Sequence, residues 1–266
     1  MAKIKLQDIA DEVGCSVATV SYVLNNNPKQ KINPETKKKI IQVASIMGYQ
    51  KNSAASALAS GKCNLIGILA GKPTFALALA EQNKMIEKLV EALAISGYQT
   101  VLLPFILTKE VHNVDAIICI NLSEEDFQTV CMNNYIPMIG LDTRVHEPWI
   151  FEVSSTFSGI KDRFLLDDYL LVTSDINSER IKDEIKGNNQ EVIFASSFIQ
   201  LDNLANRYKD KNIVVVGDEL LSYLKDKNLK LTGFNPDLAK KANKVIYCLK
   251  YAISHAEINQ HTFRLE

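Results

Sequence analysis

Hydroxyl and amide side chains gather around one short segment near the N-terminus. Ser16, Thr19 and Ser21 stand within six residues, and Asn25 follows at the far end of the same segment. If Ser16 caps a helix, the free backbone N–H groups of its first turn form a phosphate site, and neighbouring hydroxyls add donors. The pattern predicts contacts with phosphate groups. Helix capping and solubility are the ordinary alternative roles of these residues.

Three short helices are expected to hold these side chains in place. Apolar residues recur at helical spacing in a first segment that ends at Gly14, and a second helix covers Val17–Asn25. A third begins at Asn33-Pro34, where proline suits the first helical position, and ends at Gly48. Three helices within fifty residues, the first two joined by a three-residue turn, predict a helix-turn-helix domain over 1–49.

Charge is distributed unevenly along the 266 residues. Residues 1–62 hold nine lysines and four acidic residues, a net +5, so 63–266 carry −6 of the overall −1. A basic segment of this kind favours an anionic polymer as partner, although a solvated lysine face would have the same composition. Residues 50–62 are small, polar and rich in alanine, which predicts a linker that becomes helical when it is given a surface.

From residue 64 onward, apolar runs of strand length alternate with helical patterns. Strict alternation of strands and helices predicts parallel sheets that are covered on both faces. About nine strands in 200 residues fit two doubly wound sheets, with a ligand cleft at the carboxyl ends of the strands. The strands are expected at 65–70, 100–105, 116–120, 137–141, 169–173, 191–195, 213–216, 229–232 and 262–265.

Several other classes of protein are disfavoured. The sequence lacks G-x-S-x-G, G-x-x-x-x-G-K-[ST], G-x-G-x-x-G and H-E-x-x-H, and its four histidines are isolated, so no enzyme, cofactor or metal site is predicted. Five scattered cysteines without a C-x-x-C pair argue against disulfides and zinc. A charged start and the lack of any long apolar run predict a cytoplasmic protein without a membrane span.

The N-terminal segments together resemble one family. The runs LQDIADEVGCSVATVSYVLNNNP, NPETKKKIIQVASIMGY and NSAASALAS are similar to the lactose-repressor (LacI/GalR) family over residues 3–62. The remainder resembles it more weakly, in strand order and in short anchors such as LIGILAG and VVVGDELLSYL. This half is also shorter than in the family, and the segments around 158–166, from 178 and between 105 and 114 look pruned.

The resemblance implies a domain organisation. A helix-turn-helix domain (1–49) and a hinge helix or linker (50–62) precede a periplasmic-binding-protein-like domain (63–266) that regulates and dimerises. The two subdomains of that domain are expected at 63–155 with 236–258, and at 156–235 with 259–266.

In the DNA-binding head, the resemblance implies that Val17, Ala18 and Tyr22 read bases and that Ser16, Thr19, Ser21 and Asn25 contact the backbone. The third base-reading position is often arginine in the family, and 1–62 contain no arginine, so less discrimination of guanine is expected. Packing of Tyr22 on the first helix is the alternative. In the hinge, the resemblance makes Asn52 a cap, Ala55 a contact residue and Leu58 a minor-groove wedge.

In the cleft, the resemblance implies effector contacts from Arg180 and Asp218, which together would clamp vicinal hydroxyls. Phe75, after the first strand, would stack on a ring or simply pack. Gly217 stands where the family usually has asparagine, and Asp183-Glu184 stand where Gly-Phe is expected.

The resemblance therefore predicts a homodimeric repressor of a carbohydrate-utilisation operon, bound to a pseudo-palindromic operator on double-stranded DNA. A sugar or sugar-phosphate effector would control it. One alternative keeps the DNA-binding head but makes a protein corepressor the switch, with a vestigial cleft. Another is an enzyme or solute carrier with an appended helix-turn-helix.

Overall fold

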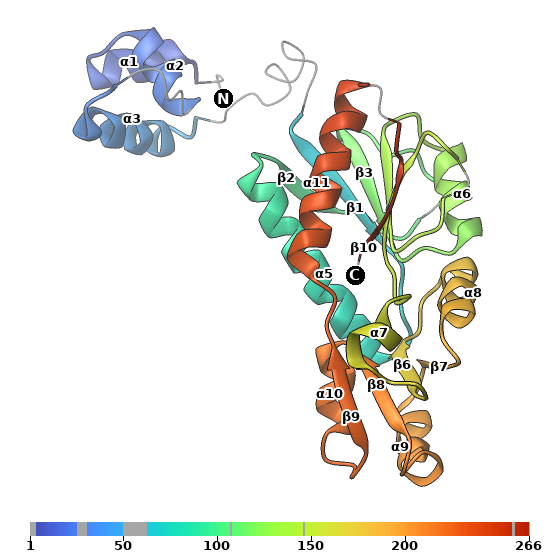
Figure 1. Ribbon diagram of the computed structural model, residues 1–266. Coiled ribbons are helices and arrows are strands. Elements are labelled where there is room, and N and C mark those ends of the chain that lie inside the picture. The colour runs from blue at the N-terminus through green and yellow to red at the C-terminus, as the bar shows by residue number, and fades with distance from the viewer. Residues whose placement is uncertain are drawn as a thin grey trace. The chain divides into compact units, whose positions relative to one another are not determined.

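The computed structural model describes residues 4–25, 31–49, 63–106, 108–145, 147–256 and 259–265. The chain divides into two compact units, residues 1–63 and 64–266, which we call the head and the body (Figure 1). No helix within the described ranges is long and apolar enough to cross a membrane.

In its described residues, the head contains α1 (Leu6–Val13), α2 (Val17–Leu24) and α3 (Pro34–Ile46). Gly14 ends α1 in the left-handed conformation, with φ +77°, which glycine adopts without strain. The turn between α1 and α2 therefore spans three residues, as predicted. One small core joins the three helices and comprises Ile9, Ala10, Val20, Val23, Ile40 and Ala44.

The body contains two parallel sheets (Figure 1). The first has the strand order β10-β5-β4-β3-β1-β2: β1 Leu65–Ala70, β2 Gln99–Leu102, β3 Ala116–Ile120, β4 Met138–Leu141, β5 Phe151–Ser155 and β10 Thr262–Leu265. The second has the order β7-β6-β8-β9: β6 Leu170–Ser174, β7 Glu191–Ala195, β8 Asn212–Val216 and β9 Lys230–Phe234. Two parallel sheets confirm the predicted fold class, and we call them with their helices the first and second subdomains.

Helices cover both faces of each sheet. They are α5 (Ala76–Ile95), α6 (Glu124–Met132), α7 (Ile160–Phe164), α8 (Glu179–Asn188), α9 (Phe198–Arg207), α10 (Asp218–Leu224) and α11 (Leu238–Ser254). Of the segments predicted as pruned, 158–166 holds the five-residue α7, the described residues between β2 and β3 hold no helix, and the segment from 178 forms the ten-residue α8.

The helix α5 belongs to two cores. Its later turns bury Met85, Leu89 and Leu93 in the core of the first sheet, together with α11. Its start buries Phe75 and Ala78 in the core of the second sheet. Figure 1 shows α5 running beside α11 and reaching the second sheet near α10.

Two expectations about the strands are corrected. The sequence pattern missed β5, because its buried Glu152 interrupts an apolar alternation only five residues long. The terminal strand was assigned to the second subdomain, but β10 pairs in parallel with β5 at the edge of the first sheet. The missing β5 explains the error, since β10 has no partner in the first sheet without it.

Candidate DNA-binding surface and regulatory cleft

The exposed face of α2 carries the residues predicted to meet bases. Val20 and Val23 are buried against α1 and α3, so Ala18, Tyr22 and Asn25 lie on the opposite, exposed side. Tyr22 is 37% exposed, and Val17 is half-buried and packs against the core of the head. The accessibility that base contact requires is therefore present at Ala18 and Tyr22, while their role stays a prediction.

The predicted phosphate residues lie near the two ends of α2. Ser16 Oγ accepts a hydrogen bond from the Thr19 amide at 3.1 Å and lies 2.8 Å from Thr19 Oγ1. At the other end, Asn25 Nδ2 donates to Ser21 Oγ at 3.1 Å. Within the head as described, the amides of the first two residues of α2 make no hydrogen bond. They are positioned to donate to an anion.

Three lysines of α3 and the three predicted hinge residues remain to be placed. On α3, Lys37, Lys38 and Lys39 are exposed, and Lys39 Nζ also donates to the carbonyl of Val13 at 3.1 Å. The three hinge residues lie outside the described residues: Asn52, Ala55 and Leu58.

A cavity of about 150 Å³ lies between the two subdomains, where the carboxyl ends of their strands meet. The residues that follow β3, β4 and β8 (Asn121, Asp142 and Gly217) line it, together with side chains from α5 and α11. This is the place where parallel sheets hold ligands. A small cavity therefore lies where the cleft is predicted.

A buried lysine occupies one wall of the cavity. Lys241, on α11, is 4% exposed. Its Nζ lies 2.6 Å from each carboxylate oxygen of Asp142 and 2.8 Å from Ser155 Oγ. An ammonium group has three donors, so this ion pair is complete without a ligand.

A chain of amides beside the cavity joins the two subdomains. Gln82 Nε2 donates to the carbonyl of Gly71 at 2.8 Å, and Asn121 Nδ2 donates to Gln82 Oε1 at 3.0 Å. From the second subdomain, the amide and the side chain of Asn177 donate to Asn121 at 2.9 and 2.7 Å. These polar groups are satisfied by one another.

Glu81 supplies the carboxylate on the α5 side of the cavity. Its Oε1 accepts a hydrogen bond of 2.6 Å from the amide of Glu219 at the start of α10. Burial raises the pKa of Glu81, and the hydrogen bond from Glu219 partly opposes that shift. Beside it, Gly217 has φ +101°, a conformation that favours glycine.

The effector residues predicted from the sequence lie elsewhere. Arg180 is exposed in the first turn of α8, and Phe75 is 5% exposed and packs against Phe198 with ring centroids 5.0 Å apart. Asp218 Oδ1 accepts from Asn235 Nδ2 at 2.5 Å. Among the described residues that line the cavity, none is one of these three predicted residues. The structure therefore does not bring Arg180, Asp218 and Phe75 together, and Phe75 packs as the alternative had it.

An ion cluster joins the subdomains beside the cleft. Arg144 Nη1 and Arg264 Nη1 lie 2.5 and 2.7 Å from Oε1 of the buried Glu152. Both arginines also pair with Glu184 on α8 of the second subdomain. Glu184 replaces an expected phenylalanine, so this departure from the family pattern adds a contact between the subdomains.

Sequence reasoning missed Lys241, Asp142 and Glu81. Each has only a weak local signature: Lys241 sits in a helix rich in lysines, and Glu81 in an alanine-rich one. The indication present in the sequence was Gly217. A glycine at a cleft position leaves room for a side chain from another segment of the chain.

The head matches the family model described as bacterial regulatory proteins, lacI family, over residues 5–52. Catabolite control protein A of Priestia megaterium is 39% identical over 66 residues, which are 25% of this chain and 19% of that protein. The HTH-type transcriptional regulator GalS of Salmonella typhimurium gives the same values. The matched segment spans about a fifth of the length of these curated relatives.

Solved structures extend the likeness to the body at the level of the fold. A lac repressor dimer bound to operator and the anti-inducer ONPF has a TM-score of 0.63 at 15% identity, covering 99% of this chain and 96% of that one. A periplasmic binding protein/LacI transcriptional regulator from Alkaliphilus metalliredigens, complexed with D-xylulofuranose, has a TM-score of 0.51 at 14% identity and covers 76% and 96%. The head is therefore similar to the lacI family of bacterial regulatory proteins, and the body shares the fold of the lac repressor structures.

Proposed function

We propose that the protein is a sequence-specific DNA-binding regulator that represses a carbohydrate-utilisation operon as a homodimer on a pseudo-palindromic operator. The observation that carries this proposal is the surface of α2. A capped helix start with two unengaged amides lies next to an exposed face that bears Ala18 and Tyr22. A helix of this kind docks in the major groove through its N-terminal residues.

Base recognition in this proposal rests on contact and shape. Val17 and Ala18 offer only apolar surface, which suits thymine methyl groups, and Tyr22 has one hydroxyl where arginine would bond to guanine twice. The hinge residues Asn52, Ala55 and Leu58 complete the proposal, with Leu58 as the wedge in the minor groove.

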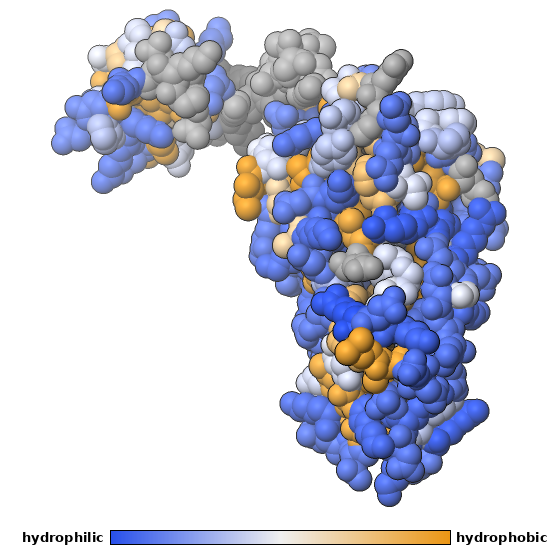
Figure 2. Space-filling view, viewed as in Figure 1, coloured by the Kyte–Doolittle hydropathy of each residue, from blue (hydrophilic) through white to orange (hydrophobic). Residues whose placement is uncertain are grey.

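The body supplies the dimer contact in this proposal. At the free edge of the first sheet, Leu102 of β2 is 68% exposed, and Ile95 at the end of α5 is 88% exposed. Figure 2 shows a hydrophobic area over this end of α5 on a largely hydrophilic face. An apolar edge strand is a common pairing surface. The related lac repressor was crystallised as a dimer on its operator.

Selection of randomised half-sites, followed by footprinting on the DNA upstream of the protein's own gene, tests the proposal. Tyr22→Ala should lower affinity for the selected site while leaving affinity for random DNA almost unchanged, at matched salt. Ile46→Ala, at another exposed apolar position of the head, is the control and should alter neither. Failure to enrich any sequence, or equal losses on both DNAs, would contradict the assignment of α2.

The cleft favours a second candidate for control, in which a protein corepressor acts and the cleft is vestigial. Ligand pockets typically measure about 300–1,000 Å³ and hold convergent polar groups that await a partner. Here the cavity is about 150 Å³, and Lys241 and Asn121 already have partners. With α5 in both cores, opening would also expose Phe75 and Ala78.

A thermal-shift panel of sugars, sugar phosphates and purines separates the two kinds of control. The second candidate expects no saturable shift for the wild type, for Arg180→Ala or for Lys241→Met. A sugar that stabilises the wild type, and loses its effect in Arg180→Ala, would restore the effector predicted from the sequence. Neither result bears on the binding of DNA by the head.

A further inference from the structure

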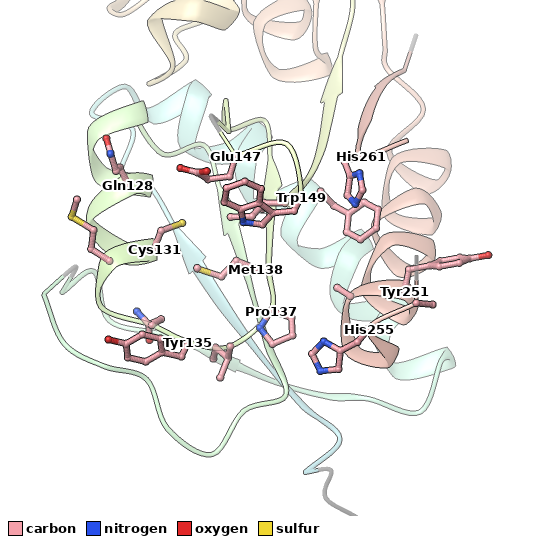
Figure 3. Close-up of a pocket in the computed structure, with 17 residues that line it drawn as sticks. Gln128, Cys131, Tyr135, Pro137, Met138, Glu147, Trp149, Tyr251, His255 and His261 are labelled. Carbon is pink, nitrogen blue, oxygen red and sulfur yellow. The ribbon is translucent and has the colours of Figure 1, made fainter. Parts of the chain in front are cut away.

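A second and larger hollow lies at the opposite end of the first sheet. It has a volume of about 670 Å³ and opens at the amino ends of β4, β5 and β10, between α6 and the last turn of α11 (Figure 3). Its volume falls within the usual range for small-molecule sites. Its lining residues include none of those that line the cleft.

Aromatic rings form much of its wall. Trp149, the single tryptophan of the chain, is 67% exposed, and Tyr135 is 92% exposed. On the far side, the ring of Phe151 contacts that of His261 at 4.7 Å, with Tyr251 close by (Figure 3). Exposed rings around a hollow present the negative faces of their π-systems to whatever enters.

The acidic group among the described lining residues is Glu147, and the wall also holds the imidazoles of His255 and His261. Glu147 lines the hollow next to Trp149 (Figure 3), and no lysine or arginine of the described residues does so. Glu147 forms no hydrogen bond or ion pair through its side chain with the residues that the structure describes. Burial, reinforced by the negative charge of Glu147, raises the pKa of Cys131 in the same wall to about 11.

Two helices also end at this hollow. Met132 is the last residue of α6 and lines it, and α11 ends at Ser254 between the lining residues Tyr251 and His255. The carboxyl end of a helix carries a partial negative charge. Ring faces, the Glu147 carboxylate and two helix ends therefore all favour the same kind of ligand.

We propose that this hollow binds a small organic cation, an ammonium or guanidinium compound, with the cation against Trp149 and Glu147. The ring faces attract an organic cation, which is only weakly hydrated, and the carboxylate of Glu147 is its counter-ion. The other polar lining residues include the neutral Gln128 and Asn134, so the aliphatic part of the ligand would contact apolar side chains. This site is independent of the proposed DNA contacts.

The position of Trp149 supplies the assay. Because the chain has one tryptophan, its fluorescence reports this hollow alone. Full-length protein is titrated with choline and, separately, with 3,3-dimethylbutan-1-ol, which has the same shape without the charge. We expect a saturable change with choline, and an affinity for the neutral analogue that is weaker by about three- to thirtyfold.

Two matched variants complete the experiment. Glu147→Gln should weaken choline binding by about three- to thirtyfold while keeping the tryptophan signal, whereas Glu125→Gln, an exposed change on α6, should leave it unchanged. Circular dichroism verifies that both variants are folded. If Glu147→Gln does not fold, Glu147→Asp takes its place in the titration. Equal affinity for the two probes, no saturable change with choline, or equal binding by both variants would overturn the proposal.

Discussion

The carboxylate of Glu81 occupies the space that a side chain at Gly217 would need. A Cβ built on Gly217 would lie 2.5 Å from Glu81 Oε1. The two residues are 136 positions apart and come from different subdomains. The glycine that departs from the family pattern and the carboxylate that enters the cleft are thus two parts of one arrangement.

Gly217→Ala should destabilise the body by about 2–4 kcal/mol, because the backbone is in a region reserved for glycine and the new methyl group meets Glu81. Urea unfolding measures the loss. Adding Glu81→Ala to Gly217→Ala should recover only the part of the lost stability that comes from the steric clash with Glu81. Gly187→Ala, in α8 with open space around its Cβ, is the control and should stabilise by up to about 1 kcal/mol. Equal effects at the two glycines would contradict this account.

Lys241→Met should cost about 3 kcal/mol, because it leaves Asp142 without its counter-ion. Combining it with Asp142→Asn should recover at least half of the loss, since the uncompensated charge is then gone. The neighbouring Lys240 is exposed. The control Lys240→Met should therefore change the unfolding free energy by less than about 0.5 kcal/mol. A double variant no more stable than Lys241→Met alone would show that the ion pair is not the cause.

The stability of the protein should depend on pH through Glu81. Its pKa is raised above the ordinary 4.5, so the folded state binds more protons than the unfolded state between the two pKa values. The stability that Glu81 contributes is therefore fully present below about pH 4.5 and is lost as the pH rises through the pKa that Glu81 has in the folded protein. Glu81→Gln keeps an acceptor for Glu219 and should unfold at a higher temperature than the wild type at neutral pH, with the advantage vanishing in acid. Melting curves from pH 4 to 8 measure this, with the exposed Glu87→Gln as control.

Tyr22→Arg should shift the half-site preference toward guanine at one position by about 1–3 kcal/mol, because the guanidinium group bonds to both O6 and N7. Parallel selections with the wild type and the variant measure the change. Unchanged preferences would mean that residue 22 does not face the bases.

The head was predictable because local signals determine it. Ser16, Gly14 and Pro34 mark helix ends directly in the sequence, and the structure ends its helices at those positions. The strands of the body were mostly predictable as well, since buried runs such as 116–120 are apolar throughout.

The cleft was not predictable for a physical reason. Its side chains come from distant segments, and each is explained only by its partner: Glu152 is buried because Arg144 and Arg264 reach it. From sequence alone, a charged residue in a strand is predicted to face solvent, because its buried partners are not yet known. The same long-range pairing hid β5, and with it the place of β10.

The shared helix α5 has a consequence for how the body melts. A protein with two separate sheets commonly loses them in two steps, each with its own enthalpy. Here the residues Met85, Leu89 and Leu93 of one core and Phe75 and Ala78 of the other belong to one continuous rod of structure. When either sheet comes apart, the rod loses the packing that keeps it helical, and the other sheet loses part of its interior. The body should therefore give a single calorimetric transition, whose van't Hoff enthalpy equals that measured directly.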